Sequence, residues 1–269
     1  MRRRARRPSP AAGSQRSLGF RQRCGVGATA TEVSTAPPHS ERFPGESDAY
    51  RRARNELLDA EVALRRQVEA VAAQRRGLPL GGPLALDYAF TEWDRAACAP
   101  RSVRLSELFE AGLDTLFLYS FMFKPGPGGS PLEVACPLCT SIIDGVDGEL
   151  PHVTRQISFA VVARAPIERF QAHAHTRGWR HPRLLSSAGT SYNRDYRAQA
   201  SDAEQFPMAT VFVRRDGRIH HFWSSELLFT AADSGQHPRP VDFMWPLWAI
   251  LDCTPAGRAP DWLPALDYR

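Results

Sequence analysis

The sequence contains a single lysine, Lys124, among its 34 basic residues, so arginine carries nearly all of the positive charge. Eight arginines lie within the first 31 residues, which hold no acidic residue. The formal net charge is +5, so the rest of the chain carries 5 − 8 = −3. A mildly acidic body gives no electrostatic reason to bind nucleic acid, and we expect no nucleic-acid partner.

Long apolar runs are also missing. No stretch of 18 or more apolar residues exists, which argues against a membrane-spanning helix and predicts no membrane partner. Arg21 and Arg23 interrupt the one apolar stretch near the N-terminus, so a secretory signal would lack its apolar region. Residues 1–45 are rich in Arg, Ser, Pro and Gly, and we expect a disordered basic tail; a transit peptide is the alternative.

Cysteines are few and their number is odd. A secreted disulfide scaffold would hold more of them, in even number, so we expect a reducing, cytoplasmic location. Only one pair is close in sequence, and the other three are expected to be bystanders. The five are Cys24, Cys98, Cys136, Cys139 and Cys253.

The most informative segment is Cys136-Pro137-Leu138-Cys139. It follows the apolar, aromatic stretch 116–123 and a Gly/Pro-rich loop, and it precedes a stretch that can be helical. The free N–H groups and positive dipole end of a helix N-terminus stabilise a thiolate. We therefore expect Cys136 to attack a substrate disulfide and Cys139, one turn deeper, to resolve the mixed disulfide. Pro137 suits the first helical turn.

Two other interpretations of this dithiol stay open. In one, the pair binds zinc, and a tetrahedral site would need two further Cys or His ligands. In the other, the pair is inert and remains in a family that has lost its activity. Haem attachment is excluded because Thr140 stands where a histidine is required. Spacing does not favour histidine chelation, and surface roles are expected for five histidines: His152, His173, His175, His220 and His221.

The rest of the chain alternates between patterns typical of helices and of buried strands. An N-terminal helix is expected over 46–78, and an irregular segment over 80–102. Asp216-Gly217 between two β-prone runs predicts a hairpin. The order predicts an α/β fold with a mainly parallel central sheet, flanking helices and an antiparallel C-terminal hairpin. The expected strands are 115–123, 157–163, 184–186, 210–213 and 219–223, and the expected helices are 139–154, 166–176, 192–200 and 243–251.

This order of elements resembles the thioredoxin fold, with Cys-x-x-Cys after the first core strand and Pro207 just before the hairpin. In that superfamily the matching proline is usually cis and docks an extended substrate against the dithiol. The resemblance thus implies that Pro207 contacts the substrate, and we expect Pro137 to contact the substrate as well. It also implies one domain over 46–269 with a core over 103–255, in which the α–β unit 166–187 is an insertion, as in peroxiredoxin-like members.

A closer resemblance is to family 899 of bacterial domains of unknown function, described as thioredoxin-like, predicted dithiol–disulfide oxidoreductases. It covers the chain from about residue 45 to the C-terminus. The segments that carry it are Tyr50-Arg51-Arg52-Ala53-Arg54, Leu64-Arg65-Arg66, Tyr119-Ser120-Phe121-Met122-Phe123, Cys136-Pro137-Leu138-Cys139, Ser186-Ser187-Ala188-Gly189, Tyr192-Asn193-Arg194-Asp195-Tyr196 and Trp245-Pro246-Leu247-Trp248.

The sequence departs from thioredoxins in two places. Ala135 stands where thioredoxins have tryptophan, and the strand 116–123 holds no buried carboxylate. Glu133, three residues before Cys136, is a substitute proton acceptor or, as we expect, an exposed loop glutamate. The segment 192–196 either lines a substrate groove or caps a short helix.

We therefore predict a thiol–disulfide oxidoreductase that uses Cys136 and Cys139 on protein or small-molecule disulfides. It needs no cofactor and is recycled by an unidentified reductant. One alternative is a thiol peroxidase, although peroxiredoxins carry Pro-x-x-x-Thr-x-x-Cys and this chain has Gly129 and Glu133 at those offsets from Cys136. The other is a non-enzymatic module that binds a metal or a partner.

Overall fold

A computed structural model describes most of the chain after the basic tail. By their contacts, the residues divide into two compact units, Met1–Val68 and Glu69–Arg269, and each is described by itself. Most of the expected tail, residues 1–45, lies outside the described residues, as does Cys24. The described residues are 39, 41–94, 96–126, 133–201, 204–234, 239–259 and 261–268.

The N-terminal helix is α1, Asp48–Arg76, which confirms the helix expected there. Its start is capped by Ser47, whose Oγ accepts a hydrogen bond from the Tyr50 N–H at 3.1 Å. Asp48 in the first turn and Arg76 in the last turn complement the helix dipole. Among the described helices, none combines the length and the apolar character needed to cross a bilayer.

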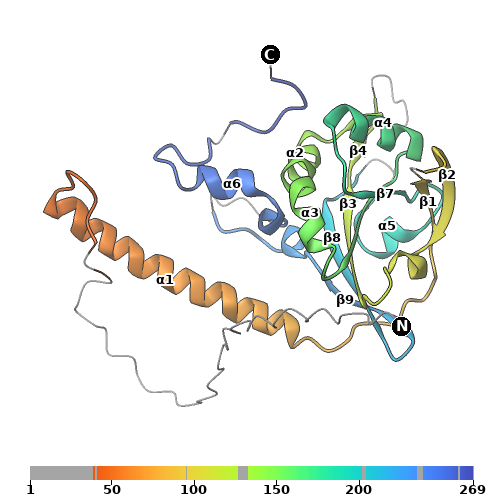
Figure 1. Cartoon of the computed structure of the whole chain (residues 1–269), viewed down its shortest axis with the longest axis horizontal. Helices are drawn as coiled ribbons and strands as arrows, with labels where there is room; N and C mark the ends of the chain where they lie inside the picture. Colours follow the sequence, from red (N-terminus) through yellow and green to blue (C-terminus); the bar gives the residue numbers. More distant parts are fainter. Residues whose placement is uncertain are drawn as a thin grey trace, which may run out of the picture. The chain divides into compact units, whose positions relative to one another are not determined.

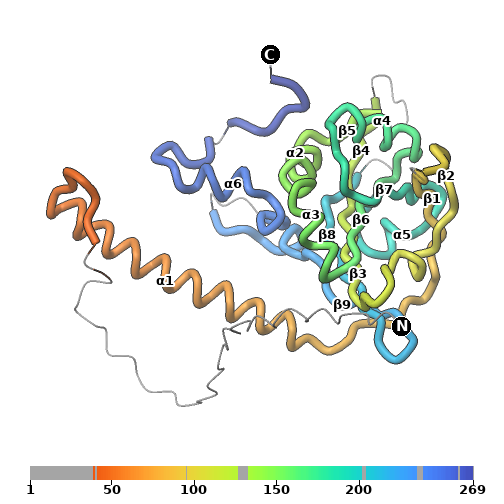
Figure 2. The backbone as a smooth tube through the Cα atoms, in the orientation of Figure 1, coloured from red at the N-terminus to blue at the C-terminus, as the bar shows by residue number. Residues whose placement is uncertain are grey.

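A seven-stranded sheet forms the centre of the second unit, in the order β2-β1-β7-β6-β3-β8-β9 (Figures 1 and 2). Strands β3, β6 and β7 run parallel at its middle, and the hairpin β8–β9 pairs antiparallel with β3. This confirms the α/β, thioredoxin-like fold. The strands are β1 Ala89–Asp94, β2 Ala99–Arg104, β3 Thr115–Phe121, β6 Ser158–Ala163, β7 Arg183–Ser186, β8 Met208–Arg215 and β9 Arg218–Ser224.

The hairpin β1–β2 corrects the expectation of an irregular segment over 80–102. These strands extend the sheet beyond β7, with β1 antiparallel to both neighbours. Their sequences carry charges, including Glu92 and Arg101, which pair across the hairpin at 2.6 Å. Charged strands at a sheet edge are common because they discourage further pairing, and they lack the apolar pattern that identifies a core strand.

The two faces of the sheet carry separate cores. Along β3 the side chains alternate: Tyr119 and Phe121 belong to one buried cluster, and Leu116 and Leu118 to the other. The first cluster packs against α2 (Pro137–Val146), α4 (Ile167–Arg177) and α6 (Pro246–Leu251). The second packs against the short helices η1 (Leu105–Leu108) and α5 (Tyr192–Asp195). The dithiol belongs to the first face.

Several elements are shorter than expected. The helix predicted over 139–154 divides into α2, η3 (Asp147–Glu149) and α3 (Leu150–Val153). Gly145 in α2 faces α6: a Cβ there would lie 3.1 Å from Pro246 Cδ, so glycine permits this approach. The helix predicted over 192–200 is only the single turn α5.

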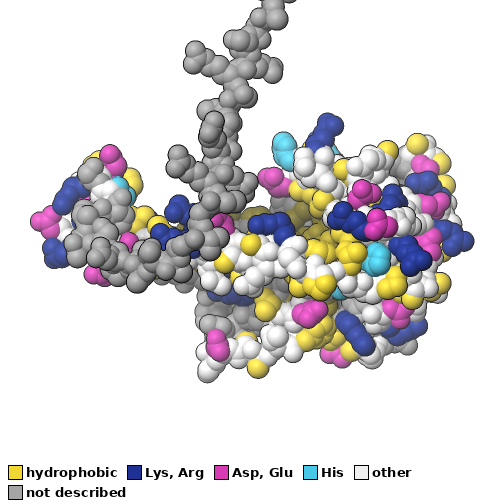
Figure 3. Space-filling view, turned by 90° about the horizontal axis from the view of Figure 1, so that it is seen from below, with side chains coloured by type: hydrophobic (Ala, Val, Ile, Leu, Met, Phe, Trp, Pro, Cys, Tyr) yellow, Lys and Arg dark blue, Asp and Glu magenta, His cyan; other side chains and the backbone are white. Residues whose placement is uncertain are grey.

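The C-terminal hairpin and the helix after it agree with the sequence pattern. Asp216 and Gly217 have φ values of 52° and 72°, as a two-residue hairpin turn with the strand twist requires. The expected last helix over 243–251 consists of η5 (Asp242–Met244) followed by α6. Over the face of the described body seen in Figure 3, basic and acidic side chains are interspersed, in line with the mild charge calculated from the sequence.

Candidate functional site

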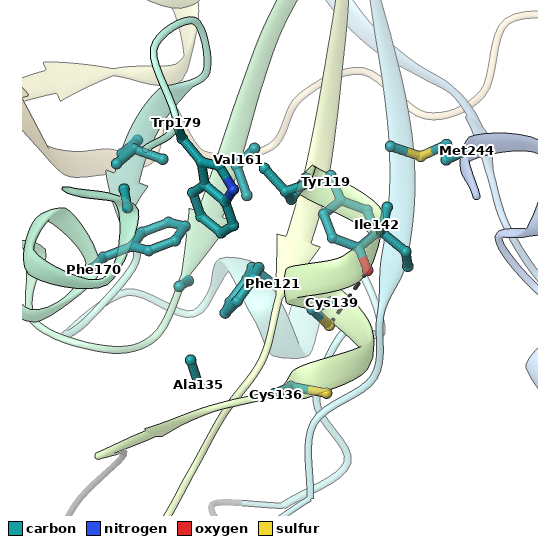
Figure 4. Close-up of a cluster of buried hydrophobic side chains, with 14 of the residues drawn as sticks. Tyr119, Phe121, Ala135, Cys136, Cys139, Ile142, Val161, Phe170, Trp179 and Met244 are labelled. Carbon is teal, nitrogen blue, oxygen red and sulfur yellow. Dashed lines mark hydrogen bonds between the residues drawn. The ribbon is translucent and has the colours of Figure 1, made fainter. Parts of the chain in front are cut away.

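The dithiol lies where the chain leaves the central strand and enters the first core helix. After β3, the short strands β4 (Phe123–Lys124) and β5 (Val134–Ala135) pair with each other and return the chain to the end of β3. The Cys136 N–H then donates to the Met122 carbonyl at 3.0 Å. Cys136, drawn in Figure 4, is the N-cap residue of α2 and Pro137 its first residue. Pro137 therefore lies in the first turn, as predicted, and the helix begins two residues before the expected 139.

Both thiols are free and buried. The exposed fraction is 2% for Cys136 and 0% for Cys139, which lies one turn deeper under the helix (Figure 4). Helical geometry therefore separates an outer sulfur from an inner one, as the assignment of attacking and resolving roles requires.

The surroundings of Cys136 favour its thiolate and lower its pKa from 9 to about 6. The largest cause is a hydrogen bond from the Cys139 S–H, which outweighs the opposing effect of burial. The backbone N–H groups of Cys139 and Leu138, free at the helix start, also donate to the sulfur, and the charge of Lys124 adds to the effect. At neutral pH Cys136 is therefore mainly ionised.

Cys139 shows the opposite behaviour. Burial raises its pKa well above 9, and the neighbouring Cys136 raises it further. Two donors oppose this: the hydroxyl of Tyr119 and the backbone of Met122. The Tyr119 hydroxyl donates to Cys139 Sγ at 3.4 Å, the contact drawn as a dashed line in Figure 4. In the reduced protein Cys139 is thus the protonated partner and Cys136 the anionic one.

Two hydrogen bonds through Thr140 connect the start of α2 to His173. The Thr140 hydroxyl donates to the Cys136 carbonyl at 2.9 Å and lies 3.0 Å from His173 Nε2. Because the hydroxyl has one proton, already donated, His173 Nε2–H is the donor in the second contact. Burial is the main cause that lowers the pKa of His173 to about 4, so its ring is neutral at pH 7.

The surface role expected for five histidines is therefore wrong for three of them. His173 is half-buried and its ring lies against Phe121, Phe123 and Trp179. His220 and His221 are also half-buried: His220 Nδ1 lies 3.3 Å from the Gly81 carbonyl oxygen, and His221 Nε2 lies 2.9 Å from the Ser224 hydroxyl. Their spacing in the sequence carried no information on the packing of α4 and β9 against the body.

Pro207 lies at the same end of β3 as the dithiol. It directly precedes Met208, which pairs with Ser120 at the end of β3, and the Cys136 N–H bonds to Met122 just beyond. The bond before Pro207 is trans, since no peptide bond in the described residues is cis. This differs from the cis form usual in the thioredoxin superfamily.

Other candidates from the sequence lie away from the dithiol. Tyr192 and Asn193 are buried on the opposite face of the sheet, so the segment 192–196 does not line a groove beside the thiols. Glu133 is exposed, as expected, and lies 3.7 Å from Arg169. Cys98 and Cys253 are exposed. In the part of the chain that the structure describes, no three Cys, His, Asp or Glu side chains gather as a metal site would require.

Three residues near the thiols were missed by the sequence analysis: Tyr119, His173 and Lys124. Tyr119 could have been recognised, because alternate residues of a strand share a face. Tyr119 therefore shares its face with Phe121, which lies just before the loop that leads to the dithiol. For Lys124 the signal was its uniqueness in the chain. His173 gave none, because its approach to Thr140 depends on the packing of α4.

One family model covers most of the chain. Residues 40–268 match the model of a family described as "Bacterial protein of unknown function (DUF899)". The chain belongs to this family. The match covers the dithiol, Tyr119 and the entire sheet of this DUF899 member. No curated protein sequence matches the chain.

Solved structures resemble this DUF899 member only distantly. Peroxidoxin BcpB of Mycobacterium tuberculosis has a TM-score of 0.36 and 17% identity, over 63% of this chain and 95% of that one. Thioredoxin peroxidase I of Plasmodium yoelii has a TM-score of 0.40 and 14% identity, over 70% and 100%. Peroxiredoxin Q of Xanthomonas campestris has a TM-score of 0.37 and 13% identity, over 54% and 84%. Similarity at this level carries no inference about activity.

Proposed function

We propose that this protein is a thiol–disulfide oxidoreductase in which Cys136 is the nucleophile and Cys139 the resolving thiol. The observation that carries the proposal is the opposite tuning of the two sulfurs. The pKa of Cys136 is lowered to about 6, whereas that of Cys139 is raised by burial. A thiolate beside a protonated partner is the state from which disulfide exchange begins.

The reaction proceeds in two exchanges. The Cys136 thiolate attacks one sulfur of a substrate disulfide, forms a mixed disulfide and releases the other substrate sulfur as a thiolate. Cys139 loses its proton and attacks Cys136 Sγ, which forms the Cys136–Cys139 disulfide and releases the second substrate sulfur. Two electrons pass from the dithiol to the substrate, whose thiolates take one proton from Cys139 and one from water. A second dithiol, as reductant, returns the pair to the thiol form.

We assign substrate contact to Pro207 and Pro137. Pro137 follows the attacking sulfur in the chain, and Pro207 precedes the strand that pairs with the end of β3. Both residues are half-buried. Neither proline has a backbone N–H, and each ring restricts its own φ, so both segments are rigid where we assign the contact with an extended substrate.

The test is a redox titration of the purified full-length chain, followed by disulfide reduction with two variants. We expect one two-electron couple that is lost in Cys136→Ser and in Cys139→Ser. Cys136→Ser abolishes reduction, and Cys139→Ser retains the mixed disulfide with the substrate. Cys253→Ser, which removes an exposed thiol, serves as the matched control and keeps full activity. Wild-type rates in both dithiol variants would refute the proposal.

A thiol peroxidase is the second candidate, and the burial of Cys136 favours it. With an exposed fraction of 2%, this sulfur is more accessible to a small peroxide than to a protein disulfide. The thiolate would attack one peroxide oxygen, giving sulfenic acid and an alcohol or water, and Cys139 would condense with it to the disulfide and water. Steady consumption of hydrogen peroxide with a dithiol reductant, abolished in Cys136→Ser, would support it; consumption unchanged by that substitution would exclude it.

A further inference from the structure

Tyr119 places a hydroxyl against the resolving sulfur. Its side chain is fully buried on β3, and its hydroxyl donates to Cys139 Sγ at 3.4 Å (Figure 4). Cys139 is also fully buried, so water does not solvate its sulfur in this arrangement. A buried tyrosine hydroxyl needs a partner, and here the partner is one of the two reacting atoms.

The second exchange requires an anion at this buried position. In the reduced protein burial and the Cys136 thiolate both keep Cys139 protonated. Once Cys136 is in the mixed disulfide, its charge is gone and burial is the remaining obstacle. The strand below the dithiol has no carboxylate over residues 116–123 that could assist. The groups that favour the Cys139 thiolate are the Tyr119 hydroxyl and the backbone of Met122.

We propose that Tyr119 is a catalytic residue of the second exchange, whose hydroxyl holds the Cys139 thiolate by hydrogen bonding while it attacks the Cys136 mixed disulfide. This inference rests on the proposed function. Tyr119 keeps its own proton, because burial raises its pKa well above 10. Cys139 gives its proton to the first departing substrate thiolate or, where that thiolate is weakly basic, to water. The electron pair of the broken Cys136–substrate bond leaves with the second substrate sulfur.

The size of the effect follows from the strength of such a bond. A hydrogen bond to a charged group contributes about 1.5–3 kcal/mol, which corresponds to a thiolate population lower by about 10- to 100-fold when it is removed. The more basic thiolate that remains is intrinsically more nucleophilic, with a Brønsted coefficient of about 0.5. The net loss in the rate of the second exchange is therefore about 3- to 10-fold.

The experiment separates the two exchanges with dithiobis(nitrobenzoate), which releases one coloured thiolate at each. A full-length background with serine at Cys24, Cys98 and Cys253 removes the other thiols. In it, Tyr119→Phe removes one oxygen and keeps the buried ring. Tyr192→Phe is the matched control, since this tyrosine is equally buried but lies on the other face of the sheet.

We expect the rate of the first phase to change less than about twofold in both variants, and its dependence on pH to be retained. The second phase is expected to slow about 3- to 10-fold in Tyr119→Phe alone. A second phase in Tyr119→Phe within twofold of the background would overturn the role of Tyr119 and leave the proposed function standing. Absence of both phases in the background itself would overturn the proposed function, and this inference with it.

Discussion

The Thr140 hydroxyl lies 3.0 Å from His173 Nε2, a contact that joins the dithiol helix α2 to α4 across 33 positions of sequence. The same hydroxyl donates to the Cys136 carbonyl at 2.9 Å. The backbone of the attacking cysteine is therefore connected, through two hydrogen bonds, to a histidine packed in the core. These two hydrogen bonds do not involve the sulfur atoms. Their contribution to stability can therefore be tested separately from the reaction of the thiols.

The Thr140–His173 contact predicts non-additive effects on stability. Thr140→Val should lower the free energy of unfolding by about 1–3 kcal/mol, because it leaves the His173 N–H without an acceptor. In the variant with His173→Phe as well, both polar partners are gone and the combined loss should be smaller than the sum. Urea unfolding of the two single variants and the double variant measures this coupling. Losses that add within about 0.5 kcal/mol would mean that the contact does not contribute.

The ionisation of Cys136 predicts its pH profile of alkylation. The rate of iodoacetamide modification at Cys136, followed by peptide mass analysis, should have its midpoint near pH 6. Cys139→Ala removes the S–H donor, the largest cause of the lowered pKa, and should move the midpoint upward. Cys253→Ala, at an exposed thiol, is the control and should leave it unchanged. A midpoint near 9 in the wild-type protein would contradict the tuning.

The charge of Lys124 predicts a smaller shift of the same midpoint. Lys124→Met removes a cation that favours the thiolate, so the pKa of Cys136 should rise, but less than on loss of the Cys139 S–H, because Lys124 is exposed and is the last of the causes. The rise should shrink as salt is added, since salt screens exposed charges. Arg218→Met removes an equal, exposed charge from the C-terminal hairpin and should have no effect. Equal shifts of the Cys136 midpoint in both variants would mean that the net charge of the protein, and not the position of Lys124, affects the pKa.

His173 predicts a loss of stability in mild acid. Its pKa is lowered to about 4 in the folded protein, against 6.5 ordinarily, mainly by burial. Between these values the unfolded chain binds a proton that the folded chain does not, so stability falls as pH decreases from 6.5 to 4. His173→Phe should reduce this loss, by an amount on the order of 1 kcal/mol after screening.

The measurement is urea unfolding at pH 7 and pH 5 for the wild-type protein and the variant. His152→Phe, at an exposed histidine, is the control and should retain the wild-type pH dependence. Because the Cys136 thiolate contributes to the same pH range in every protein compared, only the difference between variants reports on His173. If the free energy of unfolding fell by the same amount from pH 7 to pH 5 in His173→Phe as in the wild-type protein, burial of the ring would not oppose its protonation.

Local sequence signals located the start of the dithiol helix and the turn of the C-terminal hairpin. Pro137 lies in the first turn of α2 and Asp216-Gly217 forms the hairpin turn, as predicted. Each of these signals acts within a few residues of backbone, through a ring that restricts φ or a turn that requires positive φ. Such constraints are present in the sequence before any long-range contact forms.

Other features could not be predicted in this way. The edge hairpin β1–β2 was missed because its strands carry charges in place of an apolar pattern. The contact between Thr140 and His173 depends on how α4 packs against the sheet, and that between Tyr119 and Cys139 on how α2 crosses β3. Packing of this kind depends on side-chain volumes over the entire core.

By itself the sequence determined the α/β fold, the family resemblance and the position of two thiols at the start of a helix, because these follow from periodicity and from neighbouring residues. Only the tertiary structure decided how the two sulfurs differ. The hydrogen bond between the thiols and the N–H groups at the start of α2 lower the pKa of Cys136, whereas complete burial raises that of Cys139. The physical reason is that a thiol's pKa depends on desolvation and on donors brought from distant parts of the chain, which no spacing of residues records.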